Sequence, residues 1–397
     1  MKRIYITVSL TCAFILCGLI IALRLMNLTG HKEHLTVGFI YDNDESTPYT
    51  YNFSLAKDAL EKKYGAKVDI LTRSNVLDNE MAEPLRELAG QGCDIIFFNG
   101  YSELVPKLAP EYPNTQFCQT SYMDMTEATV PENYHTFKGE AYQGRYVSGI
   151  AAGMKINQMI EEGTITEDNA LVGFVAAFPT SEVISGYTAF LLGVRSVVPT
   201  ATMEVCYTQT WSSYALEKSA ASKLIKNGCI IISQHTDTIG PAIACEEAPK
   251  GKEVYFVGYN QSMSEVAPGS SLVTSRVCWE PYIISAVEAC FENKKIEKVV
   301  SGKIHGSDAS AGFEKNWIEM VDLNLQVAAP GTQEAMNSAI DRFKRGNGDF
   351  VFIGNYTGTD PDNPSHTIDL KNGYIENETT SYPTFDYVLS DIITIIE

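Results

Sequence analysis

The sequence predicts an α/β protein with two doubly wound lobes, joined by a hinge that the chain crosses several times and preceded by a transmembrane helix. Three observations support this fold class. Short apolar runs typical of buried strands alternate with segments of helical periodicity. The alternation begins at Leu35 and restarts after Thr136, and a chain of 397 residues is long enough for two such units. Because regular strand–helix alternation favours parallel sheets, each lobe is expected to contain one.

The N-terminal segment is predicted to cross a membrane. Two cationic residues precede the uncharged, mainly apolar run Ile4–Leu23, which as a helix would span roughly 30 Å. The positive start predicts a cytoplasmic N-terminus with the folded part outside. A cleaved signal peptide or a lipidated cysteine are alternatives, but no A-x-A site follows, and neither Cys12 nor Cys17 has the preceding small residue that lipidation favours. We therefore expect residues 1–34 to be an uncleaved anchor and linker at the extracytoplasmic face of the cell membrane.

The first lobe is predicted from the segments that follow the anchor. Leu35–Tyr41 is expected to be a central strand, and further strands are expected at 67–71, 94–98 and about 115–118. Helices are expected at 53–64, 80–91 and about 103–109. Each strand is thus followed by a helix, as in a parallel sheet.

The stretch Phe137–Gly193 is predicted to form the helix–strand–helix unit around which the rest is organised. Its first half has aromatic and aliphatic residues at helical spacing, and the small residues of Gly149–Gly153 leave one face nearly bare, which allows close packing on another element. Leu171–Ala177 fits a buried strand. A second helix is expected to follow, with Ser181 as its N-cap.

The remainder of the second lobe continues the alternation. Strands are expected at 202–207, 229–233 and 254–258, and helices at 214–226, about 241–247, 279–292 and 331–345. The helix 279–292 is amphipathic and is expected to pack back on the first lobe. Chain crossings are placed near Phe137–Lys138, Gly258 and Ser307–Gly312. The first lobe is then 35–137 plus about 259–310, the second is 138–258 plus about 311–349, and 350–397 is a hairpin-rich C-terminal extension.

Charge and cysteine content exclude some classes of function. The net charge of −19 argues against a nucleic-acid partner, because neutralising phosphates requires clusters of Lys and Arg. The nine cysteines include no C-x-x-C pair, so neither a zinc site nor a thioredoxin-type motif is indicated, and mostly reduced, buried thiols are expected. No cofactor or metal is predicted.

Candidate ligand-binding residues follow the predicted strands, because ligands of open α/β sheets bind outside the carboxyl ends of the strands. They share aromatic rings, amides and hydroxyls, with few fixed charges. They are Asp42, Thr47, Tyr49, Tyr51, Asn52, Asn99, Tyr101, Phe178, Trp211, His235, Asp237, Asn260 and Gln261. This set suits an uncharged polar ligand with a flat part, such as a nucleoside or base, since aromatic stacking is worth roughly 1–3 kcal/mol per base. Any one of these residues alone is as well explained as a helix cap or turn residue.

Several short segments, taken in order, resemble the basic membrane protein family, the nucleoside-type substrate-binding proteins of bacterial ABC importers. They are Tyr146–Ala152 (YVSGIAA), Gly173–Ala177 (GFVAA), Gly186–Tyr187 and Gly193. The resemblance extends from about Thr36 to about Ala339. It implies a type I periplasmic-binding-protein-like fold, a small-molecule ligand in the cleft between the lobes, and ABC permease subunits as partners.

The resemblance also implies roles for individual residues. The family's base-stacking Phe after the first strand falls on Tyr51, with Tyr49 as the alternative ring, and a second stacking Phe falls on Trp211. The family's Gly-rich loop falls on Gln234–Gly240, which keeps only its final Gly. The segment whose two Asp residues hold ribose hydroxyls falls on Gly258–Ser262, where both carboxylates are absent and Asn260 offers an amide.

The function predicted from the sequence is that of an extracytoplasmic solute-binding protein of an ABC importer, taking a purine nucleoside-like solute. A membrane-tethered ligand-sensing domain for a signalling partner is the alternative. A catalytic pair of His235 with Asp237 is an alternative interpretation, but no nucleophile elbow, H-E-x-x-H motif or phosphate-binding loop accompanies it. We therefore expect a binding loop and no enzyme activity.

Overall fold

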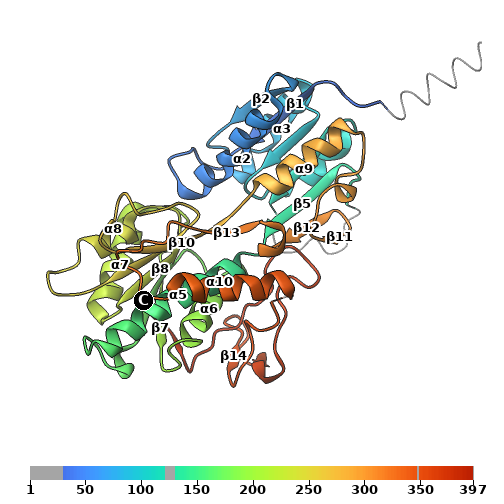
Figure 1. Cartoon of the computed structure of the whole chain (residues 1–397). Coiled ribbons are helices and arrows are strands. Elements are labelled where there is room, and N and C mark those ends of the chain that lie inside the picture. The colour runs from blue at the N-terminus through green and yellow to red at the C-terminus, as the bar shows by residue number, and fades with distance from the viewer. Residues whose placement is uncertain (1–29, 121–129, 347, 397) are drawn as a thin grey trace, which may run out of the picture.

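The computed structural model describes residues 30–120, 130–346 and 348–396. Within these residues the chain forms two lobes, each built on a seven-stranded sheet with helices on its faces (Figure 1). We call the lobe that contains β1 the first lobe and the lobe that contains β6 the second lobe. The predicted two-lobe α/β architecture is confirmed.

The first sheet has the strand order β11-β12-β5-β4-β3-β1-β2. Its neighbours are parallel except for the antiparallel pair β11–β12. The strands are β1 Leu35–Ile40, β2 Val68–Arg73, β3 Ile95–Phe98, β4 Gln116–Thr120, β5 Tyr134–Gly139, β11 Lys303–His305 and β12 Asp308–Ala311. The helices of this lobe are α2 Pro48–Tyr64, α3 Ala82–Gly90, α4 Leu104–Leu108 and α9 Glu280–Phe291. As predicted, α9 returns to the first lobe, where Phe291 packs on Tyr64 of α2.

The second sheet has the strand order β13-β10-β9-β8-β6-β7-β16, parallel except for the antiparallel pair β10–β13. The strands are β6 Leu171–Ala176, β7 Thr202–Tyr207, β8 Ile231–His235, β9 Tyr255–Tyr259, β10 Ser271–Val277, β13 Ile318–Val321 and β16 Ile393–Ile396. The helices are α5 Ala141–Glu161, α6 Ser181–Arg195, α7 Tyr214–Asn227, α8 Gly240–Glu246 and α10 Thr332–Arg345.

Helices α5 and α6 pack unusually closely, as the small-residue face of α5 predicts. A Cβ atom at Gly149 would lie 2.1 Å from the Phe190 carbonyl oxygen, and one at Gly193 would lie 2.1 Å from the Tyr146 carbonyl oxygen. Because both obstacles are backbone atoms, a side chain at either glycine would force the helices apart. This contact fixes α5 and α6 relative to each other beside the second sheet.

The chain crosses between the lobes after β5, after β10 and after β12. The crossing predicted near Gly258 is wrong, because β10 pairs with β9 and β13 in the second sheet and the chain leaves that sheet only after Val277. Residues 259–277 therefore belong with the second lobe. The strand Ser271–Val277 carries Ser, Thr and Arg within a central strand, so it has no continuous apolar run to reveal it.

Several element boundaries differ from the sequence prediction. Residues Phe137–Gly139 are not helical but extend β5, which pairs with both β4 and β12. Helix α6 begins at Ser181 itself, with Thr180 at the N-cap and no side-chain capping bond. Strand β8 begins two residues later than expected, so His235 ends the strand. Helix α2 begins at Pro48, a residue suited to the first turn because it has no N–H to satisfy.

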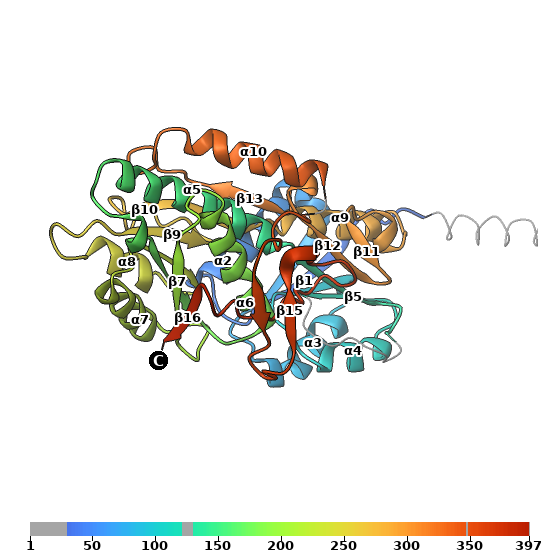
Figure 2. The ribbon, with the colours of Figure 1, turned by 90° about the horizontal axis from the view of Figure 1, so that it is seen from below.

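The C-terminal extension contains the antiparallel hairpin β14 Thr357–Thr359 and β15 Thr367–Asp369. Its last strand, β16, pairs in parallel with β7 at the edge of the second sheet (Figure 2). In the segment between the hairpin and β16, the Ser381 N–H donates to the Asp308 carboxylate of the first lobe at 2.7 Å. The extension therefore contacts both lobes, which the sequence did not indicate.

The apolar segment Ile4–Leu23, predicted to be a membrane anchor, lies outside the described residues. Among the helices that the structure does describe, none combines the length and the apolar character needed to cross a bilayer. The seven cysteines within the described residues are all free thiols, and all except the partly exposed Cys290 are buried, as expected.

Candidate ligand-binding site

A closed hydrogen-bond network lies at the carboxyl ends of β1 and β3 in the first lobe. The Asp42 N–H donates to Asn99 Oδ1 at 2.9 Å, and Asn99 Nδ2 donates back to Asp42 Oδ1 at 2.9 Å. The Thr50 hydroxyl, from α2, donates to the same carboxylate at 3.2 Å. Burial raises the pKa of Asp42, and these hydrogen bonds oppose the rise. The network fixes the N-terminal turn of α2 to the end of the sheet.

The two lobes meet where Asp237 caps α2. Asp237 Oδ1 accepts a hydrogen bond of 2.7 Å from the Tyr49 N–H, one of the amides in the first turn of α2 that have no partner within the helix. The Tyr49 hydroxyl donates to the Asn99 carbonyl at 2.6 Å. Burial raises the pKa of Asp237 to about 7, although the Tyr49 amide and the Thr47 hydroxyl stabilise its charged form. This contact explains why α2 begins before the position predicted from the sequence.

A second contact between the lobes involves three amides. Asn52 Nδ2, on α2, donates to the Val277 carbonyl at 2.7 Å and approaches Asn260 Oδ1 at 3.4 Å. Asn260 follows β9 and has φ of 65°, a left-handed conformation that asparagine tolerates better than most residues. Both asparagine side chains are buried. They hold α2 against the ends of β9 and β10.

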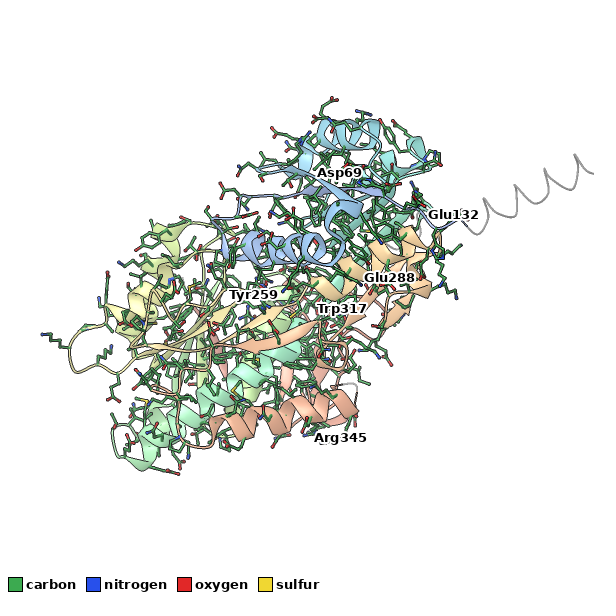
Figure 3. All side chains as sticks on the ribbon, turned by 45° about the horizontal axis from the view of Figure 1, so that its top comes forward. Asp69, Glu132, Tyr259, Glu288, Trp317 and Arg345 are labelled. Atoms are coloured by element: carbon green, nitrogen blue, oxygen red, sulfur yellow. The ribbon has the colours of Figure 1, made fainter. Side chains whose placement is uncertain are left out.

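An aromatic cluster lies at the carboxyl ends of β6, β7, β8 and β9 in the second lobe. The rings of Phe178 and Trp211 meet edge to face at 5.5 Å between centroids, and those of Trp211 and His235 lie 6.2 Å apart. The Tyr259 ring lies 4.9 Å from His235. Figure 3 shows Tyr259 at the inner end of the second lobe, on the side that faces α2. Trp211 remains 44% exposed.

An ion pair joins the lobes beside this cluster. Lys138 Nζ, at the end of β5, lies 2.8 Å from Glu182 Oε2 on α6, and His235 Nε2 lies 3.7 Å from Glu182 Oε1. Burial favours the neutral form of Glu182, but Lys138 and His235 together hold its pKa well below the usual range. Burial also lowers the pKa of His235 to about 4, so the imidazole is neutral at pH 7.

Arg145, on α5, lies at the centre of this part of the second lobe with no exposed surface. Its guanidinium carbon is 3.6 Å from the centroid of the Tyr259 ring and 5.6 Å from that of Phe174. Within the described residues, none of its three side-chain nitrogens has a hydrogen-bond partner. Burial lowers the pKa of Arg145 to about 10, which leaves it charged at pH 7.

The structure brings together most of the residues that the sequence proposed. Asp42, Thr47, Tyr49, Asn52, Asn99, Phe178, Trp211, His235, Asp237 and Asn260 are joined by the contacts described above. Gln261 lies next to them, partly buried, and its N–H donates to the Tyr259 carbonyl at 2.8 Å. Tyr101 interacts electrostatically with Tyr134 inside the first lobe.

Tyr51 and Tyr49 differ in their surroundings. Tyr51 is 39% exposed and contacts no other aromatic ring in the described part of the chain. Tyr49 is partly buried, and its ring meets that of Trp279 edge to face at 6.0 Å. Of the two rings considered for stacking, Tyr49 is the one tied to the second lobe, through its N–H bond to Asp237.

Three charged residues of this region were missed by the sequence reasoning: Lys138, Arg145 and Glu182. Lys138 lies in a strand that was not recognised, and Glu182 looked like an ordinary first-turn acid of a helix. Arg145 did carry a signal, because it is a single cation in a run of α5 that is otherwise apolar, small or uncharged. A long cationic side chain on such a helix face is costly to bury unless something compensates its charge.

The arrangement can bind a ligand but has few means of catalysis. The described residues contain no group of three or more His, Cys, Asp or Glu side chains placed to hold a metal ion. His235 is neutral and faces Glu182 rather than a nucleophile. What the region offers is aromatic faces, amides, and a buried cation with free donors.

Comparison with known proteins gives a family and a fold. A family model described as "ABC transporter substrate-binding protein PnrA-like" matches residues 35–328. A purine-binding protein of Brucella abortus is 28% identical over 265 residues, which is 66% of this chain and 70% of that protein. A putative ABC transporter glucose-binding protein of Haloferax volcanii is 29% identical over 239 residues, 60% of this chain and 56% of that protein.

Solved structures of similar fold include an ABC transporter solute-binding protein from Conexibacter woesei, with a TM-score of 0.61 and 18% identity. The match covers 78% of this chain and 96% of that one. A solute-binding protein from Aeropyrum pernix has a TM-score of 0.58 and 16% identity, and the match covers 78% of this chain and 86% of that one. These similarities confirm the predicted two-lobe periplasmic-binding-protein-like fold.

Proposed function

Because the chain belongs to the Bmp family of PnrA-like ABC transporter substrate-binding proteins, we propose that it binds a purine or purine nucleoside between its lobes and delivers it to ABC permease subunits. Substrate-binding proteins of ABC transporters carry a solute without changing it, so the chain is not an enzyme. The finer proposal concerns the ligand and the place where it binds. It is supported by the geometry of the lobe junction and by the purine-binding relative.

One observation carries the proposal: the capping of α2 by Asp237. The 2.7 Å bond from the Tyr49 N–H to Asp237 joins the carboxyl-end edge of the first sheet to that of the second. Ligands of such folds bind at these edges, and hinge closure of two lobes around a ligand is a recurrent mechanism. The same junction carries the rings of Phe178, Trp211 and Tyr259 for stacking on a flat base.

The ligand is expected to be neutral. The carboxylates of Asp42, Glu182 and Asp237 all lie at the junction, and the two cations Lys138 and Arg145 do not outnumber them, so the site has no net positive charge to attract an anionic solute. Asn52 and Asn260 offer amides for ring edges or hydroxyls, and Asn260 lies in the segment where the family's two Asp residues are expected to hold ribose hydroxyls. Amide contacts to hydroxyls are weaker than charge-assisted ones, so the base rather than the sugar is expected to dominate recognition.

Calorimetric titration of the full chain tests this proposal. We expect saturable binding of purine bases or purine nucleosides, accompanied by a rise in melting temperature, because a ligand that binds only the folded state stabilises it. D-Glucose serves as the comparison solute, since a relative is named for that sugar. Binding of glucose without binding of any purine would contradict the proposal.

We also propose that Ile4–Leu23 tethers the protein to the membrane. Fractionation of the full-length chain is expected to place it in the membrane pellet, extractable by detergent but not by high salt. Release by salt alone would contradict a hydrophobic anchor.

A further inference from the structure

Arg145 is a buried cation without a hydrogen-bond acceptor, and this points to a ligand group that the ligand-free protein lacks. The Glu182 carboxylate attracts its charge but accepts no hydrogen bond from it. Its Nε, Nη1 and Nη2 atoms are shielded from solvent, yet none has an acceptor among residues 30–120, 130–346 and 348–396. Stacking on Tyr259 at 3.6 Å stabilises the flat face of the guanidinium but leaves its five N–H donors, which point outward in the plane, unsatisfied. Such a group is costly to bury. An acceptor that arrives with the ligand would satisfy it.

His235 contributes a second unsatisfied atom beside Arg145. A Cβ atom added at Gly186 of α6 would lie 3.2 Å from His235 Nδ1 and 3.8 Å from Arg145 Nε, so both nitrogens flank the same bare stretch of helix. Nδ1 has no partner within the described structure, whereas Nε2 faces Glu182. A neutral imidazole whose Nε2 carries the proton toward that carboxylate presents Nδ1 as an acceptor.

A ligand bound in the corner formed by Arg145, Gly186 and His235 must therefore supply two neighbouring acceptors for the guanidinium and one adjacent donor for His235 Nδ1. The edge of a 6-oxopurine has this pattern, since N7 and O6 accept and the neighbouring N1–H donates. A 6-aminopurine has the opposite pattern at two of the three atoms: its N6 amine donates and its N1 accepts. A carboxylate supplies acceptors but no donor for Nδ1, and it would be repelled by Glu182.

We propose that Arg145 and His235 select 6-oxopurines over 6-aminopurines, with the guanidinium donating to O6 and N7 and His235 Nδ1 accepting from N1–H. This inference rests on the proposed purine-binding function and names the specificity residues of that site. The ring of the bound base lies against the aromatic cluster of the second lobe.

The ligand reaches this corner when the lobes separate. Tyr49 of the first lobe interacts electrostatically with both Glu182 and Tyr259 of the second, so it lies on the cleft side of the corner. Breaking the Tyr49–Asp237 and Lys138–Glu182 contacts would withdraw α2 and β5 from it. Closure over a bound base would then restore both contacts.

Titration calorimetry on the full chain with hypoxanthine and adenine, and with inosine and adenosine, tests the proposal. The wild type is expected to bind the 6-oxo compound of each pair at least about tenfold more tightly, which is the discrimination that a bidentate arginine provides. Equal or tighter binding of the 6-amino compounds would overturn the inference while leaving the proposed function intact. Failure to bind any of the four would instead contradict the proposed function.

The variant Arg145→Met separates recognition from folding. It is expected to weaken hypoxanthine binding at least about tenfold and adenine binding less than about threefold. Without ligand its melting temperature is expected to equal or exceed that of the wild type, because the variant removes an unpaired buried charge. A fall of more than about 5 °C would assign Arg145 a structural role and contradict the proposal.

Gly186→Ala is a second test that keeps both polar side chains. The added methyl group would occupy the space between Arg145 and His235, and alanine stabilises a helix relative to glycine. We expect the melting temperature to hold and hypoxanthine affinity to fall at least about fivefold. Unchanged affinity in this variant would show that the base does not bind in the corner.

Discussion

The two lobes present polar side chains at equivalent edges of their sheets, but those of Asp42, Thr50 and Asn99 in the first lobe are paired with one another, whereas several in the second lobe have no partner among the described residues. At the ends of β1 and β3, Asp42, Thr50 and Asn99 bond to one another. At the ends of β8 and β10 in the second lobe, Gln234 Oε1, His235 Nδ1 and Ser275 Oγ have no partner in the described part of the protein. The guanidinium nitrogens of Arg145 likewise have no hydrogen-bond partner among the described residues.

This difference indicates that the two lobes have different roles in ligand binding. The first lobe has a completed network that holds α2 rigidly, and it contributes its helix end and Tyr49 as a cover. The second lobe retains unsatisfied donors and acceptors, which is the state expected of a recognition surface whose partner is absent. Recognition is therefore assigned mainly to the second lobe and closure mainly to the first.

The largest effect is expected from disturbing the frame of the second lobe. Gly193→Ala places a methyl group 2.1 Å from the backbone carbonyl oxygen of Tyr146, so α5 and α6 must separate. We expect a loss of about 3 kcal/mol or more in the free energy of unfolding, measured by urea denaturation. The matched control is Gly90→Ala at the end of α3 in the first lobe, where nothing lies within 4 Å and the change is expected to be under about 1 kcal/mol. Similar losses in both variants would contradict the close packing.

An intermediate effect is expected from the ion pair between the lobes. Lys138→Met removes the cation that lies 2.8 Å from the Glu182 carboxylate, whose side chain is 18% exposed, and leaves the neutral His235 as its neighbour at 3.7 Å. We expect a loss of about 2 kcal/mol in the free energy of unfolding at pH 7. Lys107→Met, which removes an exposed pair with Glu103, is the control and is expected to cost less than about 0.5 kcal/mol.

The pH dependence of the same variant sharpens this test. The folded pKa of Glu182 lies below the ordinary value of 4.5, so its stabilising contribution is present above pH 4.5 and is lost as the pH falls below it. Acid titration of stability is expected to be steeper in the wild type than in Lys138→Met. Parallel curves below pH 4.5 would show that the pair does not hold Glu182 in its charged form.

The smallest effect concerns the cap that joins the lobes. The pKa of Asp237 is raised from 3.8 to about 7, so in that range the folded state binds the extra proton and stability falls as the pH rises. Asp237→Asn keeps an acceptor for the Tyr49 N–H but does not ionise. We expect it to be more stable than the wild type by about 1–2 kcal/mol at pH 8 and by much less at pH 4. Thermal denaturation at both pH values measures the difference; a gain that is larger at pH 4 would contradict the raised pKa.

The sequence predicted those strands and helices whose burial shows as a local pattern of apolar residues. The apolar strands were found, and Thr202–Tyr207 agrees with the structure at both ends. The strands β5 and β10 were missed because polar side chains interrupt their apolar pattern, and the partners of some of these side chains are distant in sequence. Thr136, for example, donates to Asp308 at 2.8 Å. Such partners are known only once the chain has folded.

The candidate site shows the same limit. The rule that ligands bind at carboxyl ends of strands gathered Asp42, Asn52, Asp237 and Asn260, which the structure joins across the lobes. The rule could not find Arg145, because that residue projects from a helix toward the sheet edge rather than following a strand. Its lack of a partner is a property of the folded structure and has no counterpart in local sequence.

A crystal structure of the full chain with hypoxanthine tests most directly the claim that the unsatisfied groups of the second lobe recognise the ligand. We predict that the base stacks within the aromatic cluster, that its O6 and N7 accept hydrogen bonds from Arg145, and that Tyr49 again contacts Asp237. A base bound elsewhere, or one bound in the cleft with the Arg145 nitrogens still lacking an acceptor, would contradict the account.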